Sequence, residues 1–176
     1  MERFLIVAPA GRDAEVIRQL LASAGLNALV DASGELLFDA LRDGSAAGAV
    51  VTDDALTRID HTRLRHAIAN QAPWSDFPFV LLVRRGGTRE SPKAIESVMN
   101  VTVLERPLHP ASLITAARAA TRARGRQRLA AEYLAERERA ERRLREFADT
   151  LEQKVAERTR DLASANDRLT AEIAER

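Results

Sequence analysis

Apolar residues follow two different patterns along this chain. Before the last third they form short continuous runs, which is typical of strands that are buried on both faces of a parallel sheet. Five such runs predict strands over 4–7, 26–30, 49–51, 79–83 and 101–104. Apolar residues at helical spacing predict helices around 16–24, 36–41, 64–70 and 92–99, and another that begins at about residue 110. Ser33 is the expected N-cap of the second helix.

This alternation of five strands with five helices predicts an α/β fold: a doubly wound five-stranded parallel sheet, covered by helices on both faces. Functional residues of such folds gather at the carboxyl ends of the strands. In this sequence those ends carry Ala8 and Pro9, then Asp53 with Asp54, then Val83, and finally Arg106 before Pro107.

The last third follows a different pattern, that of one long helix with a narrow apolar seam. Residues 126–176 contain 12 basic and 12 acidic side chains and neither Pro nor Gly. The apolar side chains recur in steps of three, four and seven, which indicates a coiled coil. They are Tyr133, Ala140, Leu144, Phe147, Leu151, Val155, Leu162, Leu169 and Ile173. Because so thin a stripe does not stabilise a lone helix, we expect a homodimer at least.

The end of this helix follows a clean heptad repeat. Val155, Leu162 and Leu169 fit one core position, while Thr159, Asn166 and Ile173 fit the other. An upstream set, Leu144, Phe147 and Leu151, fits a register that does not join the first directly. A phase shift between Leu151 and Thr159 resolves the mismatch, and such shifts locally unwind a coiled coil. Asn166 in a core slot favours a parallel dimer in register.

Composition narrows the classes of function. The net charge of +1 is too small for the whole protein to attract nucleic acid or an acidic membrane electrostatically. The absence of Cys excludes disulfides and thiolate metal sites. No apolar run is long enough for a membrane span, and the N-terminus lacks a signal-peptide pattern, so we expect a cytoplasmic protein. We expect two parts, a globular domain over 1–122 and a coiled-coil helix over 123–176, without metal or cofactor.

Other chemical candidates are better explained as structure. His61, His66 and His109 lack the spacing of metal ligands or of a catalytic triad, and Gly86-Gly87 lacks the spacing of a phosphate loop. Trp74 is either a partner anchor or, as we prefer, a cap on the core together with Phe77. The segment 84–92 is expected to be a solvated connector. For the arginines at 122, 124, 126 and 128, a solvated helix face is favoured over nucleic-acid binding.

Residues 3–122 resemble the receiver domain of two-component signalling. The likeness rests on the strand order, the acidic end of the third strand and the segment LERPLHPASL after the fifth. A receiver has an acidic pair after its first strand for magnesium, a phospho-accepting Asp after the third, a Thr or Ser after the fourth, and a Lys after the fifth. The corresponding residues here are Ala8 with Pro9, Asp53, Val83 and Arg106.

These departures predict a pseudo-receiver. Neither Ala8 nor Pro9 offers the side-chain oxygen that magnesium prefers, and Val83 cannot hydrogen-bond an acyl phosphate. Arg106 keeps a positive charge but differs from Lys in reach and geometry. We favour a solvated strand end in which Asp53 and Asp54 pair with Arg106. The alternative is a genuine phospho-acceptor, Asp53 or less favourably Asp54, that controls the dimer state.

The segment LEQKVAERTRDLASANDRLTAEIAER resembles the signalling helices that precede sensor or phospho-accepting modules in bacterial sensor histidine kinases. The combination implies the regulatory N-terminal region of such a kinase, with the kinase core downstream in the same parent chain. This chain itself is expected not to be an enzyme. A response regulator that binds nucleic acid through Arg122 to Arg128 is the remaining alternative.

Overall fold

The computed structural model describes residues 3–9, 11–84 and 100–174. Its strands form one five-stranded sheet in the order β2-β1-β3-β4-β5, and every neighbouring pair is parallel. The strands are β1 (Arg3–Val7), β2 (Ala28–Asp31), β3 (Ala46–Thr52), β4 (Pro78–Arg84) and β5 (Asn100–Arg106). The predicted α/β class and all five predicted strands are confirmed. Because the strands are parallel, all of them begin at one end of the sheet and finish at the other. We call the end where the strands begin the amino edge and the end where they finish the carboxyl edge.

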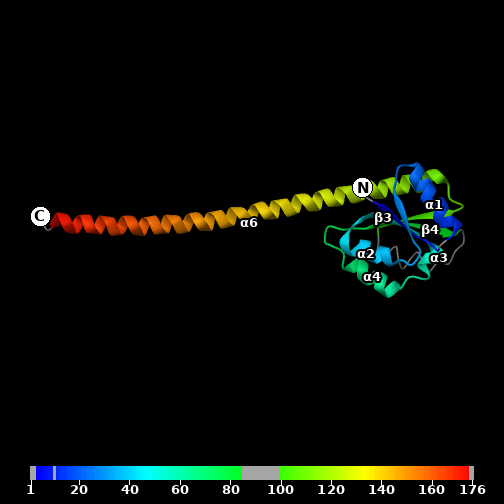
Figure 1. The fold of residues 1–176 in the computed structure, drawn as a ribbon, viewed down its shortest axis with the longest axis horizontal. Coiled ribbons are helices and arrows are strands. Elements are labelled where there is room, and N and C mark those ends of the chain that lie inside the picture. The colour runs from blue at the N-terminus through cyan, green and yellow to red at the C-terminus, as the bar shows by residue number, and fades with distance from the viewer. Residues whose placement is uncertain (1–2, 10, 85–99, 175–176) are drawn as a thin grey trace. The chain divides into compact units, whose positions relative to one another are not determined.

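The helices cover both faces of this sheet (Figure 1). They are α1 (Arg12–Ser23), α2 (Glu35–Asp43), α3 (Asp53–Leu56), α4 (His61–Ala69) and α6 (Pro110–Ala174). The short helix α3 was not expected from the sequence. The helix predicted over 92–99 and most of the connector predicted over 84–92 lie outside the described residues.

Two apolar clusters, one on each face, form the core. On one face α2, α3 and α4 contribute residues such as Leu37, Leu56 and Leu64, which pack against alternate strand residues. On the other face α1 contributes Ile17 and Leu21, and α6 contributes Leu113, Ala117 and Ala120. The sheet is therefore doubly wound, and the first turns of α6 belong to the core of the domain.

The start of α2 differs from the expectation. The N-cap is Gly34, whose φ of 81° suits glycine, so the expectation that Ser33 occupies this position is wrong. The buried carboxylate of Asp31 accepts hydrogen bonds from the backbone N–H groups of Gly34 at 2.8 Å and Leu37 at 3.0 Å. An acidic side chain at the end of β2 thus satisfies the donors that a helix N-terminus leaves open.

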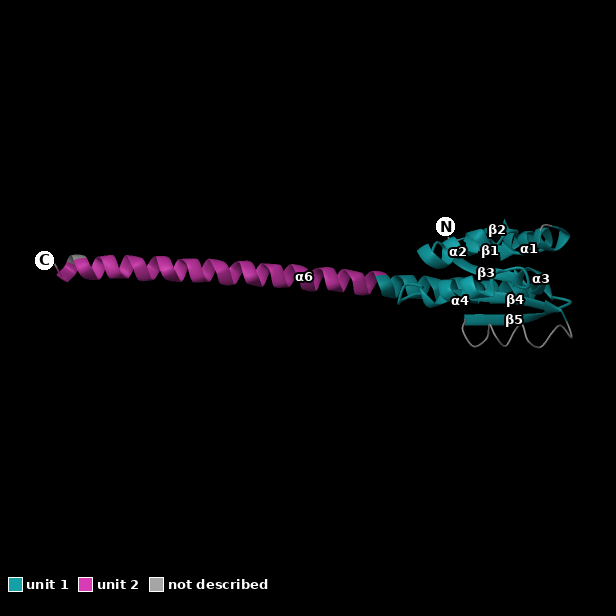
Figure 2. Ribbon diagram, turned by 90° about the horizontal axis from the view of Figure 1, so that it is seen from below, with its two compact units in different colours: residues 1–131 teal, residues 132–176 magenta. Residues whose placement is uncertain are grey.

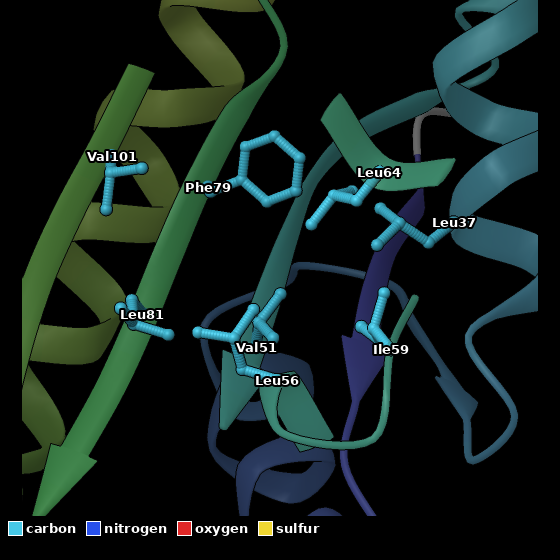
Figure 3. A pocket seen from close by; sticks show the side chains of 8 residues that line it. All are labelled: Leu37, Val51, Leu56, Ile59, Leu64, Phe79, Leu81 and Val101. Atoms are coloured by element: carbon cyan, nitrogen blue, oxygen red, sulfur yellow. The ribbon is translucent and has the colours of Figure 1, made fainter. Parts of the chain in front are cut away.

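A small gap remains in the core beneath α2 and α4 (Figure 3). Leu37, Ile59 and Leu64 face Phe79, Leu81 and Val101 across it, and its volume is about 10 Å³. Its lining is apolar and its size is at the lower limit for one water molecule, so it has the character of a packing gap. It offers no polar group to orient a ligand.

The chain divides into two compact units, Met1–Ala131 and Glu132–Arg176 (Figure 2). Helix α6 includes residues of both. The sequence-based boundary between residues 122 and 123 stays a prediction. The first unit contains the sheet, and the described part of the second is entirely helical.

Candidate functional site

The candidate site residues lie together at the carboxyl edge. Strand pairing places Val7 beside Val51 and Thr52 beside Leu82, so β1, β3 and β4 end next to one another. Ala8 is buried directly after β1, whereas Asp53 begins α3 directly after β3. This is the place where a doubly wound sheet carries its functional groups.

Asp53 is held by backbone groups. Its Oδ1 accepts a hydrogen bond from the N–H of Asp54 at 3.0 Å, and its Oδ2 accepts one from the N–H of Arg84 at 3.2 Å. Thr52, the N-cap of α3, accepts a hydrogen bond from the N–H of Ala55 at 3.3 Å and fixes the turn that carries Asp53. The Asp53 side chain stays 24% exposed, so the carboxylate is positioned but reachable from solvent.

The cation beside this acidic pair is Arg84. Its Nη2 lies 2.6 Å from Oδ2 of Asp54, and its Nε lies 3.9 Å from Oδ2 of Asp53. Arg106 instead places Nη1 2.9 Å from Oδ2 of Asp13 on α1. The expected pairing of Asp53 and Asp54 with Arg106 is therefore wrong.

The pairing of the strands explains why Arg84, and not Arg106, lies beside Asp53 and Asp54. Arg84 and Arg106 are direct partners across β4 and β5, and β4 is the strand next to β3. Two neighbouring guanidinium groups repel each other, so separate carboxylates are favourable. Arg84 is nearer to Asp53, and α1 supplies Asp13 to Arg106. Sequence reasoning missed Arg84, although its place at the end of β4 was a usable signal.

The other receiver-like positions carry no polar side chain. Ala8 is buried, Pro9 is half-buried, and Val83 is half-buried and packs against the cluster beneath α2 and α4. Within the described ranges, no three His, Asp or Glu side chains gather as metal ligands do. His109 uses Nδ1 to accept a hydrogen bond from the N–H of Ala111 at 3.3 Å, a capping role, whereas His61 and His66 are exposed.

A second polar cluster lies at the amino edge of the sheet, around Arg124 of α6. Arg124 is fully buried, and its Nη1 donates to Oγ of Ser75 at 2.7 Å and to Oε1 of Gln127 at 3.0 Å. Its guanidinium carbon lies 4.8 Å from the ring centroid of Trp74 and 5.4 Å from that of Phe77. Arginine over an aromatic face adds a cation–π attraction to these hydrogen bonds.

Neighbouring residues of α6 extend this amino-edge cluster. Gln127 exchanges two hydrogen bonds with the backbone of Asp76, at 3.2 and 2.9 Å. Arg128 donates through Nη2 to the carbonyl oxygens of Gly44 and Ala46. These contacts join α6 to the segments that precede β3 and β4.

The expected solvated face of four arginines is thus wrong for two of them. Arg124 and Arg128 point into the domain at a spacing of four, while Arg122 and Arg126 are exposed. The spacing of Leu113, Ala117, Ala120 and Arg124 is the signal that sequence reasoning missed, since it continues the buried stripe of α6. Phe77 is part of the core as expected, and Trp74 lies half-buried beside Arg124.

The second unit exposes its apolar seam. The large apolar residues of the predicted coiled-coil core are between 52% and 75% exposed: Leu144, Phe147, Leu151, Val155, Leu162, Leu169 and Ile173. Tyr133 and Leu134, at the start of this unit, are exposed as well, and Leu134 lies outside the predicted seam. Thr159 donates its hydroxyl to the carbonyl of Val155 at 2.8 Å, so a Thr in a core slot has its donor satisfied.

None of the helices in the described ranges combines the length and the apolar composition that a bilayer crossing requires. No protein-family model and no curated protein matches this chain.

Solved structures share the fold. One is a fusion protein that contains the trimeric coiled coil of yeast Spc42, with a TM-score of 0.57 and 20% identity over 85% of this chain and 99% of that one. Another is NtrX from Brucella abortus in complex with ATP, with a TM-score of 0.55 and 18% identity over 76% of this chain. This chain spans only 29% of the NtrX chain.

A third is a transiently phosphorylated switch in bacterial signal transduction, with a TM-score of 0.50 and 17% identity over 69% of this chain and 96% of that one. At these identities the likeness shows a receiver-like fold followed by a long helix.

Proposed function

We propose that this chain is a homodimeric regulatory module of two-component signalling. Its receiver-like unit does not cycle phosphate, and its α6 helix forms a parallel coiled coil that relays a conformational signal to a histidine kinase core in the same parent chain. One observation carries the proposal. A single helix, α6, is part of the first unit through the buried Leu113 and Arg124, and exposes an apolar seam from Leu144 to Ile173.

The contacts at the carboxyl edge support the loss of phosphate chemistry. Phosphoryl transfer to Asp53 needs a cation that bridges the carboxylate and the incoming phosphate, and metal ions do this with oxygen ligands. Ala8 and Pro9 supply no such oxygen, and Arg84 already neutralises Asp54 at 2.6 Å. Arg106, at the position of the receiver Lys, is engaged by Asp13 instead.

Phosphorylation is tested by mass. The protein is incubated with acetyl phosphate and magnesium and its intact mass is measured, beside a phosphorylatable receiver as positive control. We expect no added phosphoryl group. A stable adduct on the natural chain that is lost in Asp53→Asn would overturn this half of the proposal and establish the alternative, a genuine phospho-acceptor.

Self-association is supported by the exposed seam. Full burial of one large apolar side chain contributes about 1.5–3 kcal/mol of stability, and a lone helix leaves the side chains of this seam in water. A second copy covers the same seam by symmetry, which makes an isologous parallel dimer the simplest partner.

Sedimentation velocity tests this association. We expect a dimer for the natural chain and dissociation for Leu162→Glu, because a carboxylate would enter the core. Ser164→Glu, two residues away and off the seam, is the matched control and should stay dimeric. A monomeric natural chain would overturn the dimer, and a trimer would replace it with a different assembly.

The nucleic-acid alternative loses support from the amino-edge cluster. Arg124 and Arg128 are engaged within the first unit, so only Arg122 and Arg126 of the original cluster face solvent. Two exposed charges neutralise few phosphates. Binding of a labelled DNA or RNA duplex at low salt that is abolished by Arg122→Gln with Arg126→Gln would restore this alternative.

A further inference from the structure

An open pocket of about 240 Å³ lies in the first unit between α1 and the segment after β5. Apolar side chains of α1 and β4 line it, among them Val16, Ile17, Leu20 and Leu82. Ligand pockets for drug-sized molecules are about 300–1,000 Å³, so this one suits a molecule of a few carbon atoms. Its lining includes neither the acidic pair Asp53 and Asp54 nor any residue of the apolar seam of α6.

The rest of the lining is charged. Arg12 and Arg106 bring two positive charges and Asp13 one negative charge, so these three side chains leave a net charge of +1. Arg106 is only 21% exposed, which fixes its guanidinium beside the pocket. The apolar part and the cationic part of the lining thus meet in one small volume.

The ion pair between Arg106 and Asp13 is suited to exchange. Asp13 is 70% exposed, and exposed ion pairs contribute little to stability. One N–H group of Arg106 donates to Asp13, and a guanidinium carries five in a fork that matches a carboxylate. A ligand carboxylate can therefore bind Arg106 beside Asp13 or in its place.

We propose that this pocket binds a small organic carboxylate with an apolar tail. The tail lies against Val16, Ile17 and Leu20, and the carboxylate accepts hydrogen bonds from Arg106 and Arg12. A cation is disfavoured by the two guanidinium groups. Inorganic phosphate is disfavoured for two reasons. It has no apolar part to cover the apolar lining, and it brings more negative charge next to Asp13 than the single charge of a carboxylate.

The site also gives the ligand a route to α6. Ile17 and Leu82 belong to the same buried cluster as Leu113 and Ala117 of α6. A molecule against Ile17 and Leu82 therefore contacts the core that holds the signalling helix. A role for the ligand as the input signal rests on the proposed function, whereas the binding itself does not.

The experiment compares three probes of equal length on the full chain: hexanoate, hexan-1-ol and hexylamine. Amide chemical shifts are followed by NMR during each titration. We expect saturable shifts confined to α1, the end of β4 and the segment after β5, with hexanoate bound at least about tenfold more tightly than hexan-1-ol, as one charge-assisted hydrogen bond implies.

Variants then assign the charges. Arg12→Gln and Arg106→Gln should each weaken hexanoate about tenfold and leave hexan-1-ol unchanged. Arg65→Gln, an exposed arginine of α4 outside the pocket, is the matched control. Arg12 is exposed, so its variant keeps the test valid if Arg106→Gln unfolds.

Three outcomes overturn the proposal. Equal affinity for hexanoate and hexan-1-ol would show that the pocket does not recognise a carboxylate. Chemical-shift changes that do not saturate, or that occur in other parts of the chain, would show that this pocket is not a binding site. Shifts of the same residues that depend on protein concentration without a probe assign the pocket to a second copy. The mass measurement on Asp53 is independent, so failure of the proposed function and failure of this inference are distinguishable.

Discussion

The guanidinium carbon of Arg124 lies 4.8 Å from the ring centroid of Trp74, at the edge of the sheet opposite to Asp53. The same guanidinium donates to Ser75 at 2.7 Å and to Gln127 at 3.0 Å. The amino edge is thus closed by a side chain of α6. Both ends of the sheet are linked to this helix, since α6 begins after β5 at the carboxyl edge.

We expect Arg124→Ala to lower the free energy of unfolding of the first unit by about 2–4 kcal/mol. The variant loses two hydrogen bonds and the aromatic contact, and it leaves a cavity. Urea denaturation followed by Trp74 fluorescence measures the change. Arg126→Ala, on the exposed side of the same helix, should stay within about 0.5 kcal/mol of the natural chain. Equal effects of the two variants would contradict the anchoring role of Arg124.

Two glycines should respond to alanine in opposite directions. Gly44 has a φ of 70°, and a Cβ there would lie 3.1 Å from both Arg124 and Trp74, so Gly44→Ala should destabilise by about 1–3 kcal/mol. Gly125 lies within α6 with open space around it, so Gly125→Ala should stabilise by about 0.5–1 kcal/mol. Thermal unfolding of the two variants under identical conditions checks the signs, and a stabilising Gly44→Ala would refute the tight packing described around it.

Magnesium binding should be recoverable at the carboxyl edge. Ala8 and Pro9 follow β1, which lies beside β3 and therefore beside Asp53. Replacing both with Asp supplies two hard oxygen ligands next to a third. Calorimetric titration should show magnesium affinity at least about tenfold above that of the natural chain, or ~1.4 kcal/mol. A folded double variant with unchanged affinity would show that this edge is not arranged as in a receiver.

Asn166 should control the assembly state of the coiled coil. A polar residue in a core slot fixes register and strand number at a cost in stability. Asn166→Ile should therefore raise the melting temperature and broaden the distribution from dimers to larger assemblies, as measured by sedimentation equilibrium. Ser164→Ile is the off-seam control. If both variants behave alike, Asn166 does not occupy a core slot.

Acid should weaken the fold through Glu15. Its carboxylate accepts hydrogen bonds from Arg18 at 2.6 and 2.8 Å and from Gln19 at 2.9 Å, which lower its pKa from 4.5 to about 2. Because the pKa of Glu15 is depressed in the folded state, its ionised carboxylate stabilises the fold above pH 4.5, and this stabilisation is lost as the pH falls toward 2. The pKa of Glu35 is also lowered, by a hydrogen bond from the side chain of Arg63. The pKa of Asp60 is lowered by hydrogen bonds from the backbone N–H groups of Arg63 and Thr62.

Urea midpoints at about pH 5 and about pH 3 measure this loss. Glu15→Gln should lose less stability between the two conditions than the natural chain, because its amide does not titrate. Identical losses would show that the contacts of Glu15 do not contribute.

The fold was predictable because burial on both faces leaves a direct record in the sequence. The runs at Phe4 and Phe79 are short and apolar at consecutive positions, which is typical of a strand covered on both sides. The position of Asp53 followed from the end of the third run. The long helix followed from the charged segment after Gly125, which contains no helix-breaking residue.

Pairings between distant side chains were not predictable in the same way. Arg84 and Arg106 end neighbouring strands, and the sequence does not say which of them α1 will attract through Asp13. The charge of Arg124 predicts a place in solvent, whereas its spacing from Leu113, Ala117 and Ala120 puts it in the buried stripe of α6. The capping of α2 by Asp31 is different, because Asp31 lies only three residues before Gly34 and two before Ser33. Both side chains are polar and close to the helix start, and the sequence pattern does not distinguish between them.

The burial of Arg124 also sets a rule for engineered chimeras. A chain cut after residue 122 keeps Leu113 and Ala117 but removes Arg124, Gln127 and Arg128, and so uncovers Trp74. A graft of this head onto another coiled coil should therefore join after residue 131. Each residue added or removed at that junction turns everything downstream by about 100°. Arg124 thus marks the position from which the helical phase of any grafted helix is counted.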